Sequence, residues 1–102
     1  LEVYGGAKRI KDESVDIGIL TNILHQAQKP KEILKECMRT LKKEAKLLVI
    51  DWQTIGPSFG PKENELIPAE QVIETAALVG LAEMEIFKAG PYHYGLIFVK
   101  TH

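Results

Sequence analysis

The apolar positions of the chain fall into short strand-like runs, separated by stretches with helical spacing. Val15 to Leu20 is one run, and apolar side chains on both of its faces predict a strand that is covered on both sides. Residues 30–41 then repeat apolar side chains at helical spacing, and Pro30 fits the first turn of that helix. Lys46 to Trp52 is a second buried run. These three segments predict one βαβ unit with two parallel strands.

The second half of the sequence predicts a helix followed by a hairpin. Residues 68–80 carry an apolar helical face between a proline and a glycine. Residues 81–89 alternate between apolar and polar, as in a half-exposed strand, and residues 92–100 form a more apolar last strand. The short turn between these two strands predicts antiparallel pairing. Thr54 to Ile67 is a long loop, a length typical of lids and binding loops.

Composition narrows the class of protein. The chain has 102 residues, enough for one small domain, and a formal charge of -1 from 13 basic and 14 acidic side chains. Lysines alternate with glutamates instead of forming a basic stripe, so nucleic-acid binding is not expected as the main function. The single cysteine, Cys37, excludes an internal disulfide and agrees with a cytoplasmic location. No membrane span, secretory signal or metal-ligand spacing is present in the sequence.

Three stretches resemble one known family when they are taken in order. They are DESVDIGILTNILHQAQKPKEILKECMRTLKKEAKLLVIDW, LIPAEQVIETAALVGL and PYHYGLIFVK. They resemble the fourth strand, histidine loop, helix and fifth strand, then the next helix and the terminal hairpin strand, of class I (Rossmann-like) S-adenosylmethionine-dependent methyltransferases of type 11. The resemblance covers Gly5 to Lys100.

The resemblance implies an α/β fold with a partial Rossmann-like methyltransferase sheet. Parallel strands would be followed by a C-terminal antiparallel hairpin, with helices on the faces. Lys43-Glu44-Ala45 stands where the family usually has Pro-Gly-Gly. The family's glycine-rich loop and the acidic residue after its second strand have no counterpart here. Residues 1–102 are therefore expected to be one domain, the C-terminal portion of a methyltransferase domain whose cofactor-binding N-terminal half is missing, and to be inactive alone.

The resemblance assigns the cofactor edge to the loop after the first long strand. Asn22, Ile23, Leu24 and His25 would contact S-adenosylmethionine, and His25 would orient the substrate or act as a base. The alternative for His25 is a structural role, either capping the next helix or packing. Methyl transfer mainly requires that donor and acceptor be aligned, so the absence of a catalytic triad from the sequence does not count against this function.

Two further groups are candidates for binding an unidentified, small-molecule methyl acceptor. Asp51 and Trp52 end the second buried strand, at the edge where α/β sheets bind ligands. Tyr92, His93 and Tyr94 form an aromatic cluster at the start of the last strand and could also reach the acceptor. The alternative for both groups is packing, because strands are rich in aromatic residues anyway.

Loss of the first strands would leave Val15 to Leu20 at the edge of the sheet. An apolar strand edge without a hydrogen-bonded partner tends to pair with another chain. The sequence therefore predicts either a homodimer through this strand or that Leu1 to Tyr4 covers its edge. The alternative function is accordingly a non-catalytic α/β dimerisation module that does not bind the cofactor by itself.

Overall fold

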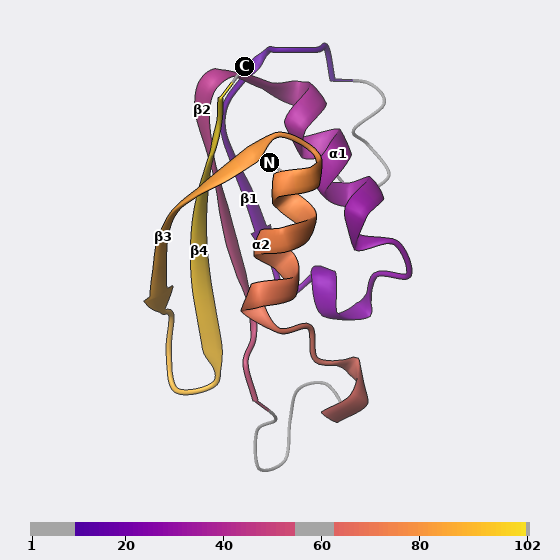
Figure 1. Cartoon of the computed structure of the whole chain (residues 1–102), viewed down its shortest axis with the longest axis vertical. Coiled ribbons are helices and arrows are strands. Elements are labelled where there is room, and N and C mark those ends of the chain that lie inside the picture. Colours follow the sequence, from indigo (N-terminus) through magenta and orange to yellow (C-terminus); the bar gives the residue numbers. More distant parts are fainter. Residues whose placement is uncertain (1–9, 55–62, 102) are drawn as a thin grey trace.

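The computed structural model describes residues 10–54 and 63–101, which form a four-stranded sheet and two helices (Figure 1). The strands are β1 (Val15–Thr21), β2 (Leu41–Trp52), β3 (Leu81–Lys88) and β4 (His93–Lys100); the helices are α1 (Pro30–Thr40) and α2 (Ala69–Leu78), with single 3-10 turns η2 (Leu24–Gln26) and η3 (Glu63–Glu65). The strand order across the sheet is β1-β2-β4-β3. The predicted α/β fold class is confirmed.

Strand pairing also follows the sequence prediction. β1 and β2 are parallel, and β4 pairs antiparallel with both β2 and β3. β2 begins at Leu41, earlier than the predicted Lys46. Val15 pairs with Leu41 but Ile17 already pairs with Lys46, so the intervening residues of β2 bulge out of the ladder. Glu44, one of these residues, has a positive φ of 70°. It lies in the turn where the resemblance places the family's Pro-Gly-Gly. The expected strand from Leu1 to Tyr4 lies outside the described residues.

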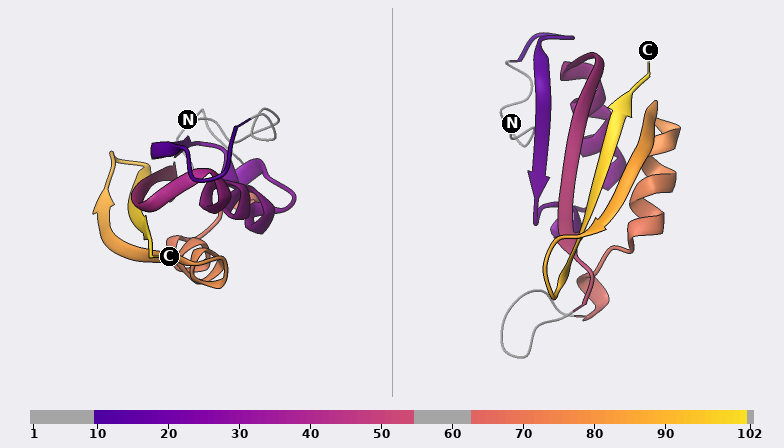
Figure 2. Two further views of the ribbon diagram at one scale, coloured as in Figure 1. Left: turned by 90° about the horizontal axis from the view of Figure 1, so that it is seen from above. Right: turned by 90° about the vertical axis from the view of Figure 1, so that its left-hand side faces the viewer.

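Both helices lie on the same face of the sheet (Figure 2). α1 buries Leu34 and Cys37 there, and α2 buries Val72 and Ala76. Burial raises the pKa of the Cys37 thiol from 9.0 to about 12, which suits a packing residue and not a nucleophile. In the part of the chain that the structure describes, neither helix has the length and hydropathy needed to cross a membrane.

The other face of the sheet is open over β1. Gly18 and Leu20 are buried beneath the helices, whereas Ile17 and Ile19 are 56% and 41% exposed. The prediction that β1 is covered on both faces is therefore wrong for the described residues. Apolar side chains on both faces predict two covering layers, but both described helices pack on one side.

We expect the open edge of β1 to mediate self-association, because β1 pairs only with β2 within the described sheet. The wild-type chain should sediment as a dimer in analytical ultracentrifugation. The Ile19→Lys variant should sediment as a monomer, because a lysine on an edge strand disfavours pairing with a second copy.

A lysine placed elsewhere provides the matched control for this variant. Leu78 is 74% exposed on α2, and that helix packs against β3 at the opposite side of the sheet. The Leu78→Lys variant should remain dimeric. A wild-type chain that is monomeric at all accessible concentrations would rule out association through β1.

Candidate functional site

The carboxyl ends of β1 and β2 lie side by side, because the two strands are parallel neighbours. Asn22 follows β1 directly, with a positive φ of 57° that asparagine tolerates better than most residues. Its backbone N–H donates to the carbonyl oxygen of Ile50 at 2.8 Å, so the chain is still paired with β2 where it leaves the sheet. η2 then places His25 over the end of β2.

The side chain of Asp51 joins these two strand ends. Its carboxylate is fully buried, and the His25 Nδ1 atom lies 2.9 Å from Oδ1. The backbone N–H of His25 donates to Oδ2 at 3.2 Å, and the backbone N–H of Trp52 donates to Oδ1 at 2.8 Å. Because a buried carboxylate is costly unless its oxygens are hydrogen-bonded, these contacts fix the loop after β1 relative to β2.

The sequence predicts His25 at the cofactor edge and Asp51 in the acceptor site, and the structure brings the two side chains into contact. The alternative that His25 caps the next helix is wrong, because its ring bonds Asp51 and the residue before α1, Lys29, makes no side-chain cap. Asp51 itself is closed off from an incoming substrate. Asp51 is therefore better placed to orient His25 than to contact an acceptor directly.

The side chains of the other predicted cofactor residues differ in burial. Leu24 is buried in the hydrophobic core, so its side chain is not free to reach a ligand, whereas Ile23 is only partly buried against that core. Asn22 is different: its Oδ1 atom is buried and has no hydrogen-bond partner in the described structure. Among residues 10–54 and 63–101, no three His, Cys, Asp or Glu side chains are grouped so that they could hold a metal ion.

Trp52 and His93 lie on the opposite face of the sheet from Asp51. They are cross-strand partners, and their ring centroids are 4.1 Å apart with an interplanar angle of 38°. The Nε2 atom of His93 is buried without a hydrogen-bond partner among the described residues. Tyr92 is half-buried and accepts the backbone N–H of Gln53 at its carbonyl oxygen. Side chains alternate along a strand, so the predicted acceptor group is divided between two faces.

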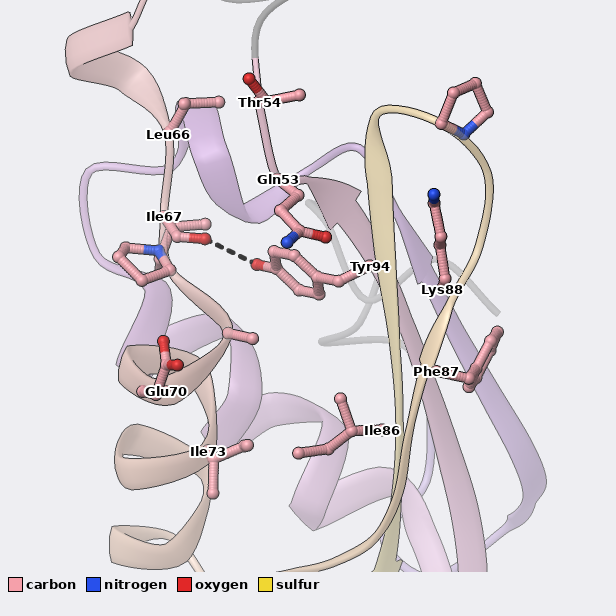
Figure 3. A pocket seen from close by; sticks show the side chains of 13 residues that line it. Gln53, Thr54, Leu66, Ile67, Glu70, Ile73, Ile86, Phe87, Lys88 and Tyr94 are labelled. Carbon is pink, nitrogen blue, oxygen red and sulfur yellow. Dashed lines mark hydrogen bonds between the residues drawn. The ribbon is translucent and has the colours of Figure 1, made fainter.

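A groove of about 860 Å³ opens beside the end of β2, on the helix-covered face (Figure 3). It lies between α2 and the β3–β4 hairpin. Tyr94 projects into the space between these walls. The lining of the groove is mainly apolar and includes Ile67, Ile73 and Ile86. Gln53, Glu70 and Lys88 supply the polar groups of the lining.

Tyr94 is the member of the predicted aromatic cluster that reaches the groove. It pairs with Asp51 across the sheet, and its hydroxyl donates to the carbonyl oxygen of Ile67 at 2.8 Å. Burial raises the pKa of the Tyr94 hydroxyl above its usual range, and the negative charges of Asp51 and Glu70 raise it further. Strand alternation separates Tyr94 from His93, because the neighbour of His93 must face the side of the sheet that carries Asp51.

The Tyr94→Phe variant should lower the free energy of unfolding by about 1 kcal/mol at neutral pH, since the Ile67 carbonyl loses its donor. A pKa raised in the folded state gives stability below the ordinary tyrosine value of about 10 that is lost as the pH rises above it. The wild-type protein should therefore lose stability more steeply above that pH than Tyr94→Phe does.

Urea unfolding as a function of pH measures this difference. Equal alkaline slopes for wild type and Tyr94→Phe would contradict the assigned burial of the hydroxyl.

Comparison with known proteins agrees with this architecture. Residues 5–49 match the sequence model of a methyltransferase domain. A putative type 11 methyltransferase from Sulfolobus solfataricus superposes with a TM-score of 0.80 at 23% identity, over 96% of this chain and 57% of that one. An S-adenosylmethionine-dependent methyltransferase from Aquifex aeolicus gives 0.80 at 24% identity, over 90% and 49%. The cyclase SpnF gives 0.71 at 15%, over 89% and 51%.

No curated protein sequence matches the chain significantly. The chain spans about half the length of the solved structures that it matches. The sequence resemblance to type 11 methyltransferases is thus confirmed by both comparisons: residues 5–49 match a methyltransferase domain, and the described chain superposes on part of the fold of two solved methyltransferases.

Proposed function

We propose that this chain is the C-terminal portion of an S-adenosylmethionine-dependent methyltransferase and forms one edge of its cofactor site. The observation that carries the proposal is the meeting of Asn22, His25 and Asp51 at the carboxyl ends of two parallel strands. Open α/β sheets bind their ligands at this edge. The methyltransferase-domain match over residues 5–49 includes Asn22 and His25.

The donor set at this edge fits part of the cofactor. S-adenosylmethionine, when bound, supplies a methyl group on an activated sulfonium. The buried Oδ1 atom of Asn22 lacks a donor in the described structure, and the cofactor carries donors in its ammonium group and ribose hydroxyls. A buried acceptor without a donor is costly, so a ligand donor would remove that cost. We assign Asn22 to the cofactor on this basis and leave Leu24 to the core.

The groove beside β2 supports a small-molecule acceptor. Its volume of about 860 Å³ falls within the range of about 300–1,000 Å³ that small-molecule sites occupy. Its mainly apolar lining, with Glu70 and Lys88 as charged groups, favours an acceptor with an apolar body and at least one polar substituent. Asp51 pairs with Tyr94 at the end of the groove, so the groove and the proposed cofactor edge are neighbours.

The fold by itself does not establish methyl transfer, since one of the similar structures is a cyclase. Calorimetric titration of S-adenosylhomocysteine into the 102-residue chain tests the cofactor edge directly. We expect saturable binding that Asn22→Gly weakens by about tenfold, the loss expected for one buried hydrogen bond. Glycine keeps the positive φ of this position accessible, so the variant removes the side chain without straining the backbone.

Glu44 offers a matched control, because it also has a positive φ but lies in the bulge at the other end of β2. Glu44→Gly should bind S-adenosylhomocysteine as the wild type does. Absence of any saturable heat would reject the cofactor edge for this chain and favour the alternative of a non-catalytic module. Equal binding by wild type and Asn22→Gly would reject the role of Asn22.

A further inference from the structure

The groove carries its two charged side chains on opposite walls. Glu70 lies in the first turn of α2, and Lys88 is the last residue of β3 (Figure 3). Among the described lining residues, Glu70 is the only acid and Lys88 is the only base. Both residues are exposed, and no ion pair between described residues involves either of them. Each charge is therefore available to a ligand.

The strand register separates Lys88 from the cofactor edge. Lys88 pairs with Tyr94, and Tyr94 pairs with Asp51, so the three residues form one row across β3, β4 and β2. Neighbouring strands are about 4.8 Å apart, so the backbone of Lys88 is roughly 10 Å from that of Asp51. Directly paired residues share one face of a sheet, which places Lys88 on the side of the groove. An anion bound at Lys88 would lie away from the cofactor edge.

The part of the groove around the hydroxyl of Tyr94 is electronegative. Burial, and then the negative charges of Asp51 and Glu70, raise the pKa of that hydroxyl above its usual range. The hydroxyl donates its proton to the carbonyl oxygen of Ile67 at 2.8 Å, so this donor is already occupied. A cationic group is therefore favoured beside Glu70, and an anionic group is disfavoured there.

Each wall also supplies an apolar side chain next to its charge. Ile73 lies three residues after Glu70, on the same side of α2, and Ile86 lies two residues before Lys88, on the same face of β3. Figure 3 shows the two isoleucine side chains on facing walls. The groove thus offers apolar contact together with one negative and one positive wall.

We propose that the groove is specific for a zwitterionic acceptor, a small molecule whose apolar body carries a cationic group at one end and an anionic group at the other. Glu70 binds the cationic group, Lys88 binds the anionic group, and the isoleucines contact the body. This inference rests on the proposed methyltransferase function and names the class of its acceptor. Because Lys88 lies two strands from Asp51, the anionic end points away from the cofactor edge.

Three small probes test this class when they are titrated into the 102-residue chain at neutral pH and followed by nitrogen-15 NMR of the backbone amides. Para-(aminomethyl)benzoate carries both charges on a benzene ring, whereas para-methylbenzylamine keeps only the cation and para-methylbenzoate keeps only the anion. We expect the zwitterionic probe to bind about threefold more tightly than either other probe, an increment typical of a partly exposed ion pair. It should shift the amides of Ile73 and Tyr94. Equal affinities for the three probes, or no saturable shift with any of them, would overturn the proposal.

Variants of the two charged residues test which wall binds which end. Glu70→Gln should weaken binding of the zwitterionic and cationic probes by about threefold and leave the anionic probe unchanged. Lys88→Gln should weaken the zwitterionic and anionic probes and leave the cationic probe unchanged. The double variant Glu70→Lys, Lys88→Glu should bind the zwitterionic probe as the wild type does, because the probe can turn end for end. Single variants that keep every wild-type affinity would reject the assigned roles.

Glu32→Gln and Lys46→Gln are the matched controls. Glu32 is the acid in the first turn of α1, as Glu70 is in α2, and Lys46 is exposed on the face of β2 opposite the groove. Both variants should keep all wild-type affinities for the probes. A loss of affinity in the controls as large as in the groove variants would show that net charge, and not the groove, governs binding, and would contradict the proposal.

Calorimetric titration of S-adenosylhomocysteine separates this inference from the proposed function. Glu70→Gln and Lys88→Gln should bind it as the wild type does, because neither residue lies at the cofactor edge. Weaker binding in either variant would assign that charge to the cofactor and overturn the zwitterionic acceptor. No binding even by the wild type, with the selectivity for the zwitterionic probe intact, would reject the proposed function and leave the groove as a binding site for zwitterionic molecules.

Discussion

The buried carboxylate of Asp51 is the interaction on which the arrangement of the site depends. It accepts hydrogen bonds from the loop after β1 and from the end of its own strand, and it holds the ring of His25. A buried charge costs several kcal/mol unless such partners are present. The loop that carries Asn22 and His25 is therefore held against β2, although apart from η2 it has no regular secondary structure.

The same carboxylate lies between the two parts of the site, the loop after β1 and the groove beside β2. Asp51 ends on the helix-covered face, where its cross-strand partner Tyr94 projects into the groove. Tyr94 in turn is fixed by its hydrogen bond to Ile67, just before α2. A chain of contacts thus runs from the proposed cofactor edge to the wall of the groove. Small-molecule transfer reactions need this kind of rigid alignment more than they need strong acids or bases.

A half-covered sheet has physical consequences for the chain. In the described sheet the helices bury one face, and on the other face Ile17 and Ile19 of the edge strand β1 are exposed. Exposed apolar side chains beside unpaired backbone groups favour association with another chain. The solved structures with this fold are about twice as long, so the described residues correspond to only part of their fold.

The sequence by itself determined the elements and their order. The helical spacing after Pro30, the apolar run before Asp51 and the short turn before His93 each depend on local contacts, and local periodicity is readable from sequence. It also identified His25, Asp51 and Trp52 as strand-end residues. The sequence did not reveal which faces of the sheet are covered, because apolar character shows a preference for burial and not the partner that satisfies it.

Only the tertiary structure decided which candidates meet. His25 and Asp51 are 26 positions apart, and their contact depends on the parallel register of β1 and β2. Trp52 and His93 were separated from that pair because adjacent strand residues point to opposite faces. The same alternation brought Tyr94 into the groove in place of His93. Such contacts are set by register and side-chain direction, which arise from packing over the whole sheet and not from any single segment.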